Sequence, residues 1–363
     1  MLPFCAISLI AAIRVVTLVP KSATAQEKLK RVDWLGNLFF IISTAILLLA
    51  VSWGGTQYDW QSAATLIPLC LGVAGYVWTF FYEACIAKEP FLSRDLFRCT
   101  SSAAAYACGA IQGLVVRFRT IQLIKCGVNP YIKIYGQLYY VPFYFLAVKG
   151  YSPMHAGLAL LPVMLTLVPS SIITGILVTR FQNYTYPIWI GWILTTTGSG
   201  LTILWDDTTH LAAWVIILVI LGLGHGTVLN AQNFATQALC STGLEGNAAS
   251  MYAFLRQFGM ALGVGVGSSV FQNSMSIKLI WEGLSPAIAT QSEAFITNIS
   301  ILPEGSLFKE QVLDAYSYGF RGVYILFTAI SGVGFLLSLF IKQVDMMKEI
   351  KTEHKLLTIS NRI

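Results

Sequence analysis

Polar side chains that can bind a solute or carry a proton occur within one strongly apolar stretch around residue 225. His225 lies between two glycines, and Gln232 follows two helical turns later on the same face. Asn230, Asn233 and Gln237 lie on a neighbouring face. An imidazole with a pKa of about 6.5 can carry protons, and buried amides can also bond neighbouring helices. The pattern predicts either a polar cavity lined by His225, Asn230 and Gln232 or polar contacts between helices.

A second polar group is Arg256, which is followed by Gly259, Gly263 and Gly267 at a spacing of four residues. Such a stripe lets a neighbouring helix approach closely, so we expect these glycines to pack helices together. Arg256 either reaches the membrane interface through its long side chain or brings a positive charge into the cavity. Both interpretations stay open at this point.

Gln112 and Tyr139, in an earlier apolar region, are the remaining cavity candidates. No carboxylate lies in the middle of an apolar stretch, since Glu83 falls near an end. The four histidines are scattered without metal-binding spacing, and the seven cysteines lack CxxC pairs. We therefore expect no catalytic residue, no metal site and no cofactor. We also expect that the chain is not an enzyme.

The elements that position these residues are apolar stretches of about the length that crosses ~30 Å of hydrocarbon. Hydrophobic residues make up 56% of the chain and charged residues 11%, against about 25% charged in a soluble domain. Helices are expected because lipid offers backbone groups no partner. The sequence predicts an all-α polytopic membrane protein with about nine transmembrane helices. The stretches are 3–20, 34–53, 63–85, 101–116 continued by 135–148, 156–179, 186–205, 211–230, 249–271 and 318–341.

Basic residues fall mostly on alternate loops, which predicts the orientation of the chain because cytoplasmic loops carry the excess of Lys and Arg. This places residues 342–363 in the cytoplasm as a basic tail and makes the net charge of +6 a topology signal. We expect the lipid bilayer as partner, the plasma membrane as location, and no nucleic acid. The loop from Gln272 to Ala315 is then outside, where Asn298 matches a glycosylation pattern, while Asn183 lies inside.

One apolar region is interrupted by residues 117–134, which contain Arg117, Arg119, Lys125 and Lys133. Each cation at mid-membrane depth costs roughly 2.5 to 3.5 kcal/mol. Removing the segment restores an unbroken span. We therefore expect a translated intron in preference to a functional loop, and sequencing the transcript distinguishes the two.

Several short motifs, in order along nearly the whole chain, resemble one family of transporters. The motifs are Asp33-Trp34-Leu35-Gly36-Asn37, Ser52-Trp53-Gly54-Gly55, Glu89-Pro90, Leu96-Phe97-Arg98, Leu138-Tyr139-Tyr140-Val141-Pro142, Val148-Lys149-Gly150-Tyr151-Ser152-Pro153, Gly157-Leu158 with Leu161-Pro162, Gly175 with Arg180, and Phe254-Leu255-Arg256-Gln257-Phe258-Gly259. Together they resemble the fourteen-span drug:proton antiporter branch of the major facilitator superfamily, especially fungal efflux pumps.

This resemblance implies a domain plan. Residues 1–20 are similar to the family's sixth span, 21–100 to two linker spans with cytoplasmic loops, and 101–341 to the carboxy-terminal six-helix bundle. The first five spans are expected to be lacking. Gly175 and Arg180 resemble a weak copy of a cytoplasmic loop motif, for which we expect membrane anchoring in preference to gating.

The resemblance also implies an activity, the export of a drug or small metabolite in exchange for protons. Because one bundle is expected, we predict a truncated transporter with little or no transport alone. The alternative is a non-transporting remnant or partner, which pairs with a complementary amino-terminal half or inhibits a full-length transporter.

Overall fold

The computed structural model describes residues 33–54, 58–86, 94–97, 99–115, 137–205, 209–303 and 305–344. In these ranges the regular elements are helical apart from one isolated bridge between Gly54 and Tyr58. Five helical segments there are long and apolar enough to cross a membrane. The prediction of an all-α polytopic membrane protein is confirmed. The segment 1–20, the interruption 117–134 and the tail beyond residue 344 lie outside the described residues.

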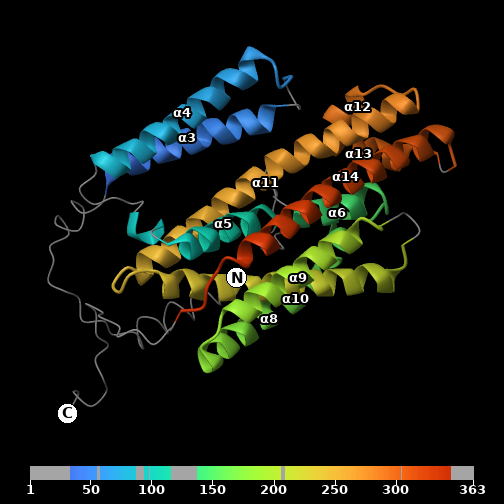
Figure 1. Ribbon diagram of the computed structural model, residues 1–363. Helices are drawn as coiled ribbons and strands as arrows, with labels where there is room; N and C mark the ends of the chain where they lie inside the picture. The colour runs from blue at the N-terminus through green and yellow to red at the C-terminus, as the bar shows by residue number, and fades with distance from the viewer. Residues whose placement is uncertain are drawn as a thin grey trace, which may run out of the picture.

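The elements follow one another along the chain as a series of helices (Figure 1). In order they are α3 (Trp34–Trp53), α4 (Ala63–Cys85), the short 3-10 helix η1 (Arg94–Phe97), α5 (Thr100–Val115), α6 (Gln137–Ala147), α7 (Pro153–Leu158), α8 (Leu161–Phe181), α9 (Thr185–Thr202), α10 (Leu211–Leu239), α11 (Glu245–Trp281), α12 (Ala287–Thr290), α13 (Ser292–Ile301) and α14 (Leu307–Ser338).

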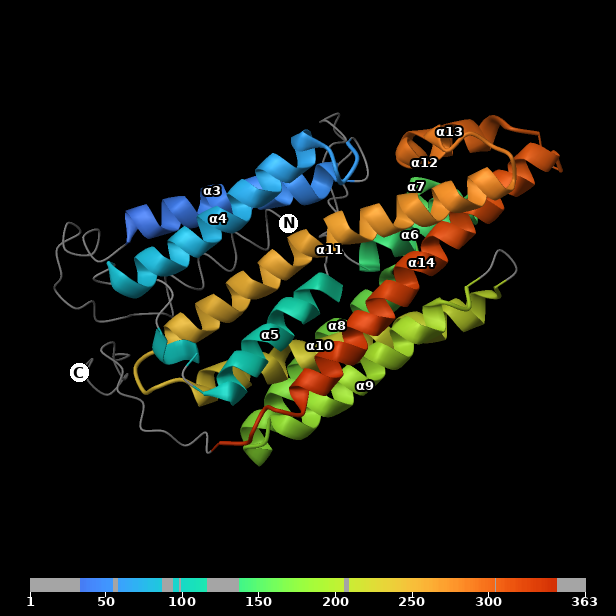
Figure 2. The ribbon, with the colours of Figure 1, turned by 45° about the horizontal axis from the view of Figure 1, so that its top comes forward.

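Helices α3 and α4 form a hairpin beside α11, on the edge of the helical bundle (Figures 1 and 2). Helix α3 begins where Asp33 accepts a hydrogen bond from the Gly36 N–H at 2.9 Å, a side-chain cap for an otherwise unpaired donor. Ser269 of α11 donates to the Gly54 carbonyl at 2.9 Å, and the ring of Phe40 meets that of Phe254 edge-on at 4.8 Å. The hairpin is thus fixed to α11 by polar and aromatic contacts.

The bundle buries small residues where helices cross and exposes apolar side chains on its outer faces. An added Cβ at Gly226 of α10 would lie 2.3 Å from the Leu167 carbonyl of α8, and one at Gly224 would lie 2.6 Å from the Thr195 nitrogen of α9. On the outside, Ile176 is 60% exposed. Apolar exposure with close internal packing suits a bilayer, where tight van der Waals contact holds helices together.

Several stretches differ from the sequence prediction; α10, for example, continues to Leu239 instead of ending at residue 230. The stretch 156–179 was expected to be continuous, but α7 ends at Leu158 and α8 begins at Leu161. The break is only Ala159 and Leu160, and Pro153–Phe181 is still apolar and long enough to cross a membrane as one segment. Pro162 lies in the first turn of α8, where proline is favoured because its missing N–H leaves no helical bond unmade.

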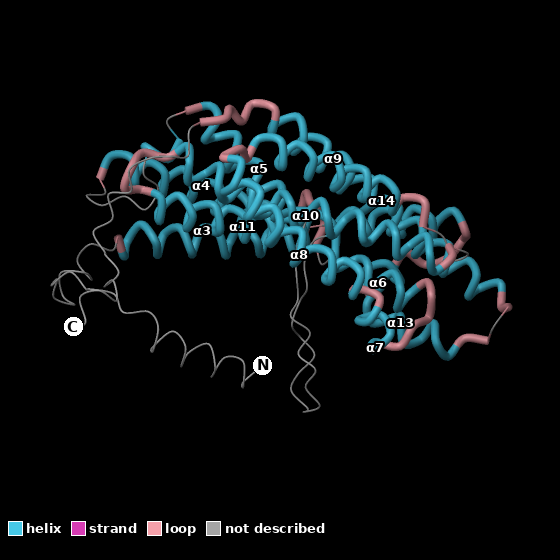
Figure 3. Tube along the Cα trace, turned by 90° about the horizontal axis from the view of Figure 1, so that it is seen from below, coloured by secondary structure: helices cyan, strands magenta, loops and turns pink. Residues whose placement is uncertain are grey.

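The segment 272–315, which was expected to be a loop between two spans, is largely helical. Helix α11 continues to Trp281, α14 begins at Leu307, and α12 and α13 lie between them beside α6 and α7 (Figures 2 and 3). The Tyr316 hydroxyl donates to the Ser292 carbonyl at 2.5 Å, which fastens the start of α13 to α14.

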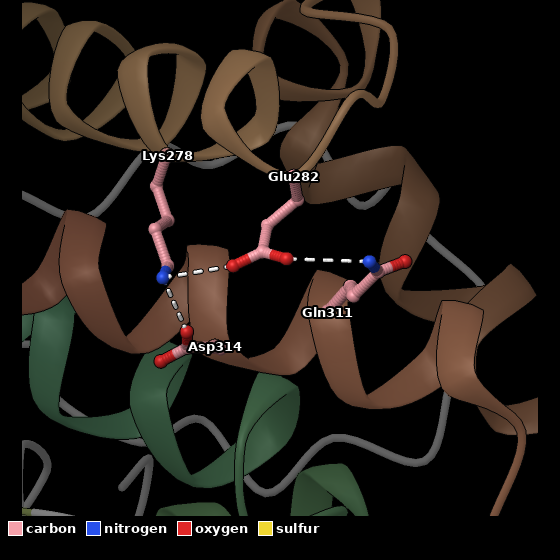
Figure 4. A network of polar contacts seen from close by, with 4 residues as sticks. All are labelled: Lys278, Glu282, Gln311 and Asp314. Carbon is pink, nitrogen blue, oxygen red and sulfur yellow. Dashed lines mark hydrogen bonds and ion pairs between the residues drawn. The ribbon is translucent and has the colours of Figure 1, made fainter.

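Ion pairs hold these two extensions together beyond the predicted spans (Figure 4). Lys278 of α11 contacts Glu282 at 2.9 Å and Asp314 of α14 at 2.7 Å, and Gln311 donates to Glu282 at 3.2 Å. Hydrogen bonds to Asp314 and Glu282 keep the pKa of Lys278 above its ordinary value, and the bond to Lys278 lowers the pKa of Glu282. These pairs add to the apolar packing of Leu279 and Val312, which are both fully buried in the same region.

At the opposite end, the last turn of α14 meets the starts of α5 and α9. The Tyr184 hydroxyl donates to the Lys342 carbonyl at 2.7 Å, and Ser101 donates to the Phe340 carbonyl at 3.0 Å. Gln343 also donates to the Gln182 carbonyl at 2.8 Å. The basic residues Arg180 and Lys342 therefore share one end of the bundle, while the direction in which the chain crosses the membrane stays a prediction.

Candidate functional site

A buried polar cluster joins α5, α10 and α11 in the interior of the bundle. Gln112 of α5 donates to the carbonyl of His225 in α10 at 3.3 Å. The Tyr252 hydroxyl of α11 points at two acceptors, Gln112 Oε1 at 2.7 Å and the Leu229 carbonyl at 3.0 Å. Gln112 thus uses both ends of its amide to tie one helix to each of its neighbours.

The cluster forms here because glycines let α11 lie directly against α5. An added Cβ at Gly113 would lie 1.8 Å from the Arg256 carbonyl, and one at Gly109 would lie 2.8 Å from the Tyr252 ring. From the other side, an added Cβ at Gly259 would lie 1.9 Å from the Ala110 carbonyl. Only hydrogen atoms fit at these crossings, so the backbones approach closely enough for Tyr252 to reach Gln112.

Several polar atoms beside this bonded network are buried and have no hydrogen-bond partner among the described residues. They include both ring nitrogens of His225, both amide atoms of Gln232 and Nε of Arg256. His225 is 1% exposed and Gln232 is fully buried. Leaving a buried polar group unpaired costs about 1–3 kcal/mol. These atoms are therefore available for a solute, a proton or a segment outside the described ranges.

Arg256 adds a positive charge to the same region. It is half-buried, lies one helical turn after Tyr252, and is near enough to both Tyr252 and His225 for electrostatic interaction. The cluster consequently combines a guanidinium, an imidazole, a phenol and two amides inside an apolar bundle. That set can hydrogen-bond a polar solute and can respond electrostatically to an added proton.

The other residues singled out from the sequence lie elsewhere. Asn230 donates to the Ser171 carbonyl at 2.7 Å and to its hydroxyl at 2.9 Å, so it contacts α8 instead of the cluster. The side chain of Tyr139 lies outside the described residues. Asn298 is exposed on α13, and Arg180 is exposed at the end of α8.

The three glycines of α11 contact two different helices. An added Cβ at Gly263 would lie 2.3 Å from the Leu114 carbonyl, so Gly259 and Gly263 both meet α5. One at Gly267 would lie 2.9 Å from the Tyr140 ring of α6. Gly175 of α8 is looser, with the nearest atom, on Asn230, at 3.5 Å from an added Cβ.

Tyr252 is the member of the cluster that sequence reasoning missed. A tyrosine near the end of an apolar stretch is typical of the membrane interface, which hid its role. Its position four residues before Arg256, on the same helical face, was the available signal.

Comparison with known proteins agrees with this architecture. The sequence family described as Major Facilitator Superfamily matches residues 17–264. MFS transporter L2 of Phoma sp. is 33% identical over 358 residues, covering 97% of this chain and 56% of the relative. Efflux pump FUS6 of Gibberella moniliformis is 29% identical over 365 residues, covering 97% and 61%. MFS-type efflux pump LUC4 of Fusarium sp. is 27% identical over 363 residues, covering 98% and 61%.

The chain therefore spans little more than half the length of these curated relatives. Their names describe transporters and efflux pumps, in agreement with the expectation that the chain is not an enzyme. The match of the superfamily over most of the chain, together with a bundle of apolar helices, settles the family. The chain belongs to the Major Facilitator Superfamily.

Proposed function

We propose that this chain acts in a secondary transporter that exports a small amphipathic metabolite or drug in exchange for protons. The relatives named as efflux pumps support the direction of transport. The ordered motifs support the finer assignment to the fourteen-span drug:proton antiporter branch. In our proposal the chain resides in the plasma membrane, and its carboxy terminus lies in the cytoplasm.

The observation that carries the proposal is the group of unpaired polar atoms on α10 and α11. His225 and Gln232 lie on one face of α10, and Arg256 reaches the same region from α11. A bundle held together by van der Waals packing gains nothing from unpaired polar atoms, whereas a transport pathway requires them. We assign substrate contact to Gln232 and Arg256.

The proton-carrying group in this proposal is His225. An imidazole can take up a proton at a ring nitrogen, both ring nitrogens of His225 lack a partner among the described residues, and Arg256 would repel the ring once it is charged. Protonation would then favour a rearrangement of α10 relative to α11, where Gln112 and Tyr252 are bonded to the carbonyls of His225 and Leu229.

The mechanism of such transporters is the rocking of two bundles around a central site. The described residues supply one bundle together with the α3–α4 hairpin. A second bundle would come from a longer form of the chain or from another polypeptide. Co-expression with a six-span amino-terminal half distinguishes the transporter from a non-transporting partner: we expect co-purification in both cases, but export only in the first.

Export of an uncharged amphipathic fluorescent dye, from a pump-deficient host that co-expresses the amino-terminal half, tests the site. His225→Gln and Gln232→Leu should each reduce proton-dependent export at least tenfold, the effect of ~1.4 kcal/mol. Ser250→Ala is the matched control, because this hydroxyl on α11 is exposed and bonds only its own helix. If both variants export as much dye as the natural chain at equal membrane abundance, the cluster is not part of the transport pathway. Strong export by the chain alone would contradict the need for a second bundle.

A further inference from the structure

A groove of about 450 Å³ runs along the outer surface of α8, α9 and α10, away from the polar cluster. Its apolar lining includes Leu165, Pro169, Ile173, Leu177, Ile190 and Leu223. Leu223 lies two residues before His225 in α10, so the two side chains leave the helix in nearly opposite directions. The groove is therefore separate from the candidate transport site.

Three of the four hydroxyl-bearing residues that line the groove bond back to their own helix. Thr166 donates to the Pro162 carbonyl at 2.7 Å, Ser170 to the Leu167 carbonyl at 3.0 Å, and Thr227 to the Leu223 carbonyl at 2.8 Å. Hydroxyls bonded back to their own helix present mainly their carbon atoms to the outside. The surface is consequently suited to a hydrocarbon chain more than to a polar solute.

The groove opens toward the space that lipid occupies around a membrane helix. Leu165 is 69% exposed, and Ile173 and Ile190 are each 55% exposed, on helices apolar enough to span a bilayer or packed directly against one. From Leu165 to Leu177 the groove extends about 18 Å along α8. One leaflet contributes about 15 Å of the hydrocarbon core, so the groove matches the depth of an acyl chain.

A positive charge lies at one end of the groove. Arg180 follows Ile173 by seven residues and Leu177 by three, which puts it on the groove face of α8 just beyond the apolar lining. It is exposed, and no ion pair joins it to an acidic residue within the described ranges. A guanidinium at this position matches a phosphate in both charge and geometry.

We propose that the groove binds one phospholipid, with an acyl chain along α8, α9 and α10 and its phosphate against Arg180. The apolar lining, the length and the charge at one end together specify a phosphate-bearing amphiphile. A purely apolar ligand would not use Arg180, and a polar solute would meet a mostly apolar lining in which three of the four hydroxyl groups are already bonded. Binding would anchor the end of α8 to the headgroup layer of its leaflet.

Native mass spectrometry of the purified full chain in detergent tests this, with dioleoyl phosphatidylglycerol as the probe and dioleoylglycerol as the phosphate-free comparison. Arg180→Gln should weaken binding of the phospholipid about fivefold, the effect of ~1 kcal/mol per basic residue at a lipid surface, whereas Arg180→Lys should retain most of it. Arg321→Gln, which removes an equal charge from an exposed position on α14, should have no effect.

A second variant tests the acyl chain independently of the charge. Thr227→Phe fills the floor of the groove and should displace the bound phospholipid, while Ile176→Phe, at an exposed position on α8 that does not line the groove, should not. Equal loss in Arg180→Gln and Arg321→Gln would overturn the proposal, because it would mean nonspecific attraction. Equal affinity for dioleoylglycerol, or unchanged binding in Thr227→Phe, would overturn it as well.

Discussion

Replacing Gly259 with alanine should force α11 away from α5. The new Cβ would lie 1.9 Å from the Ala110 carbonyl oxygen, where ordinary contact begins near 3.4 Å. The difference, 3.4 less 1.9, is 1.5 Å, and the obstacle is backbone that no side-chain rotation can move. The neighbouring contact of Gly113 with the Arg256 carbonyl, equally close, would open at the same time.

The expected cost follows from these distances. Overpacking a well-filled interior costs typically ~1–3 kcal/mol, and a clash with backbone belongs at the upper end. Alanine gains about 1 kcal/mol of helix propensity over glycine in water, but little of this applies in a bilayer, where an unassembled span remains helical. At roughly 2 °C per kcal/mol for a chain of this size, the melting temperature should fall by about 5 °C.

The assay is the melting temperature of the detergent-solubilised protein, read as the loss of its monodisperse peak in size-exclusion chromatography after heating. Gly246→Ala is the matched control in α11, because an added Cβ there has no neighbour within 4 Å. The double variant Gly113→Ala with Gly259→Ala should cost less than the sum of the two, since one displacement relieves both clashes. Equal melting of Gly259→Ala and Gly246→Ala would refute the reasoning.

Three further outcomes are expected. Gln112→Leu removes a hydrogen-bond donor and an acceptor from the cluster and should lower the melting temperature by about 2 °C, the effect of ~1 kcal/mol; unchanged melting would contradict the network. Because Lys278 holds the pKa of Glu282 below its ordinary 4.5, the ion pair contributes fully above that pH and is lost as the pH falls through the lowered pKa. Acid should therefore lower the melting temperature of the natural chain more than that of Glu282→Gln. If the melting temperatures of the two proteins fall equally with pH, this ion pair does not contribute to stability. Endoglycosidase treatment should shift the electrophoretic mobility unless Asn298 is changed to Gln, whereas a shift that depends on Asn183 would reverse the orientation.

The ends of helices that stay within the hydrocarbon could be predicted from the sequence. The ends of helices that extend beyond it could not. The predicted stretches 34–53 and 63–85 match α3 and α4 residue for residue, because apolar length alone determines a span. Helices α11 and α14 run past their predicted ends because Leu279 and Val312 are buried between them and Lys278 pairs with Asp314. Such pairing joins residues far apart in sequence, which apolar length does not predict.

The candidate site was predicted in part. His225, Gln112 and Arg256 were chosen as polar residues within apolar stretches, and they lie near one another. Asn230 was chosen by the same rule but contacts α8. Residue spacing predicts which face of a helix a side chain lies on, but it does not predict which helix packs against that face. The groove beside Arg180 was not predicted, because its walls come from three helices and no single segment carries its pattern.

Because α11 is long, a small tilt at the polar cluster produces a large displacement at its far end. Its 37 residues extend about 55 Å, more than the ~40–45 Å of a whole bilayer. From Arg256 to Lys278 the axis covers about 33 Å, so a tilt of about 10° at the polar cluster would displace the far end by about 6 Å. A movement too small to follow at the cluster would thus become measurable at the far end of α11, where a pair of spin labels on α11 and α9 would report it.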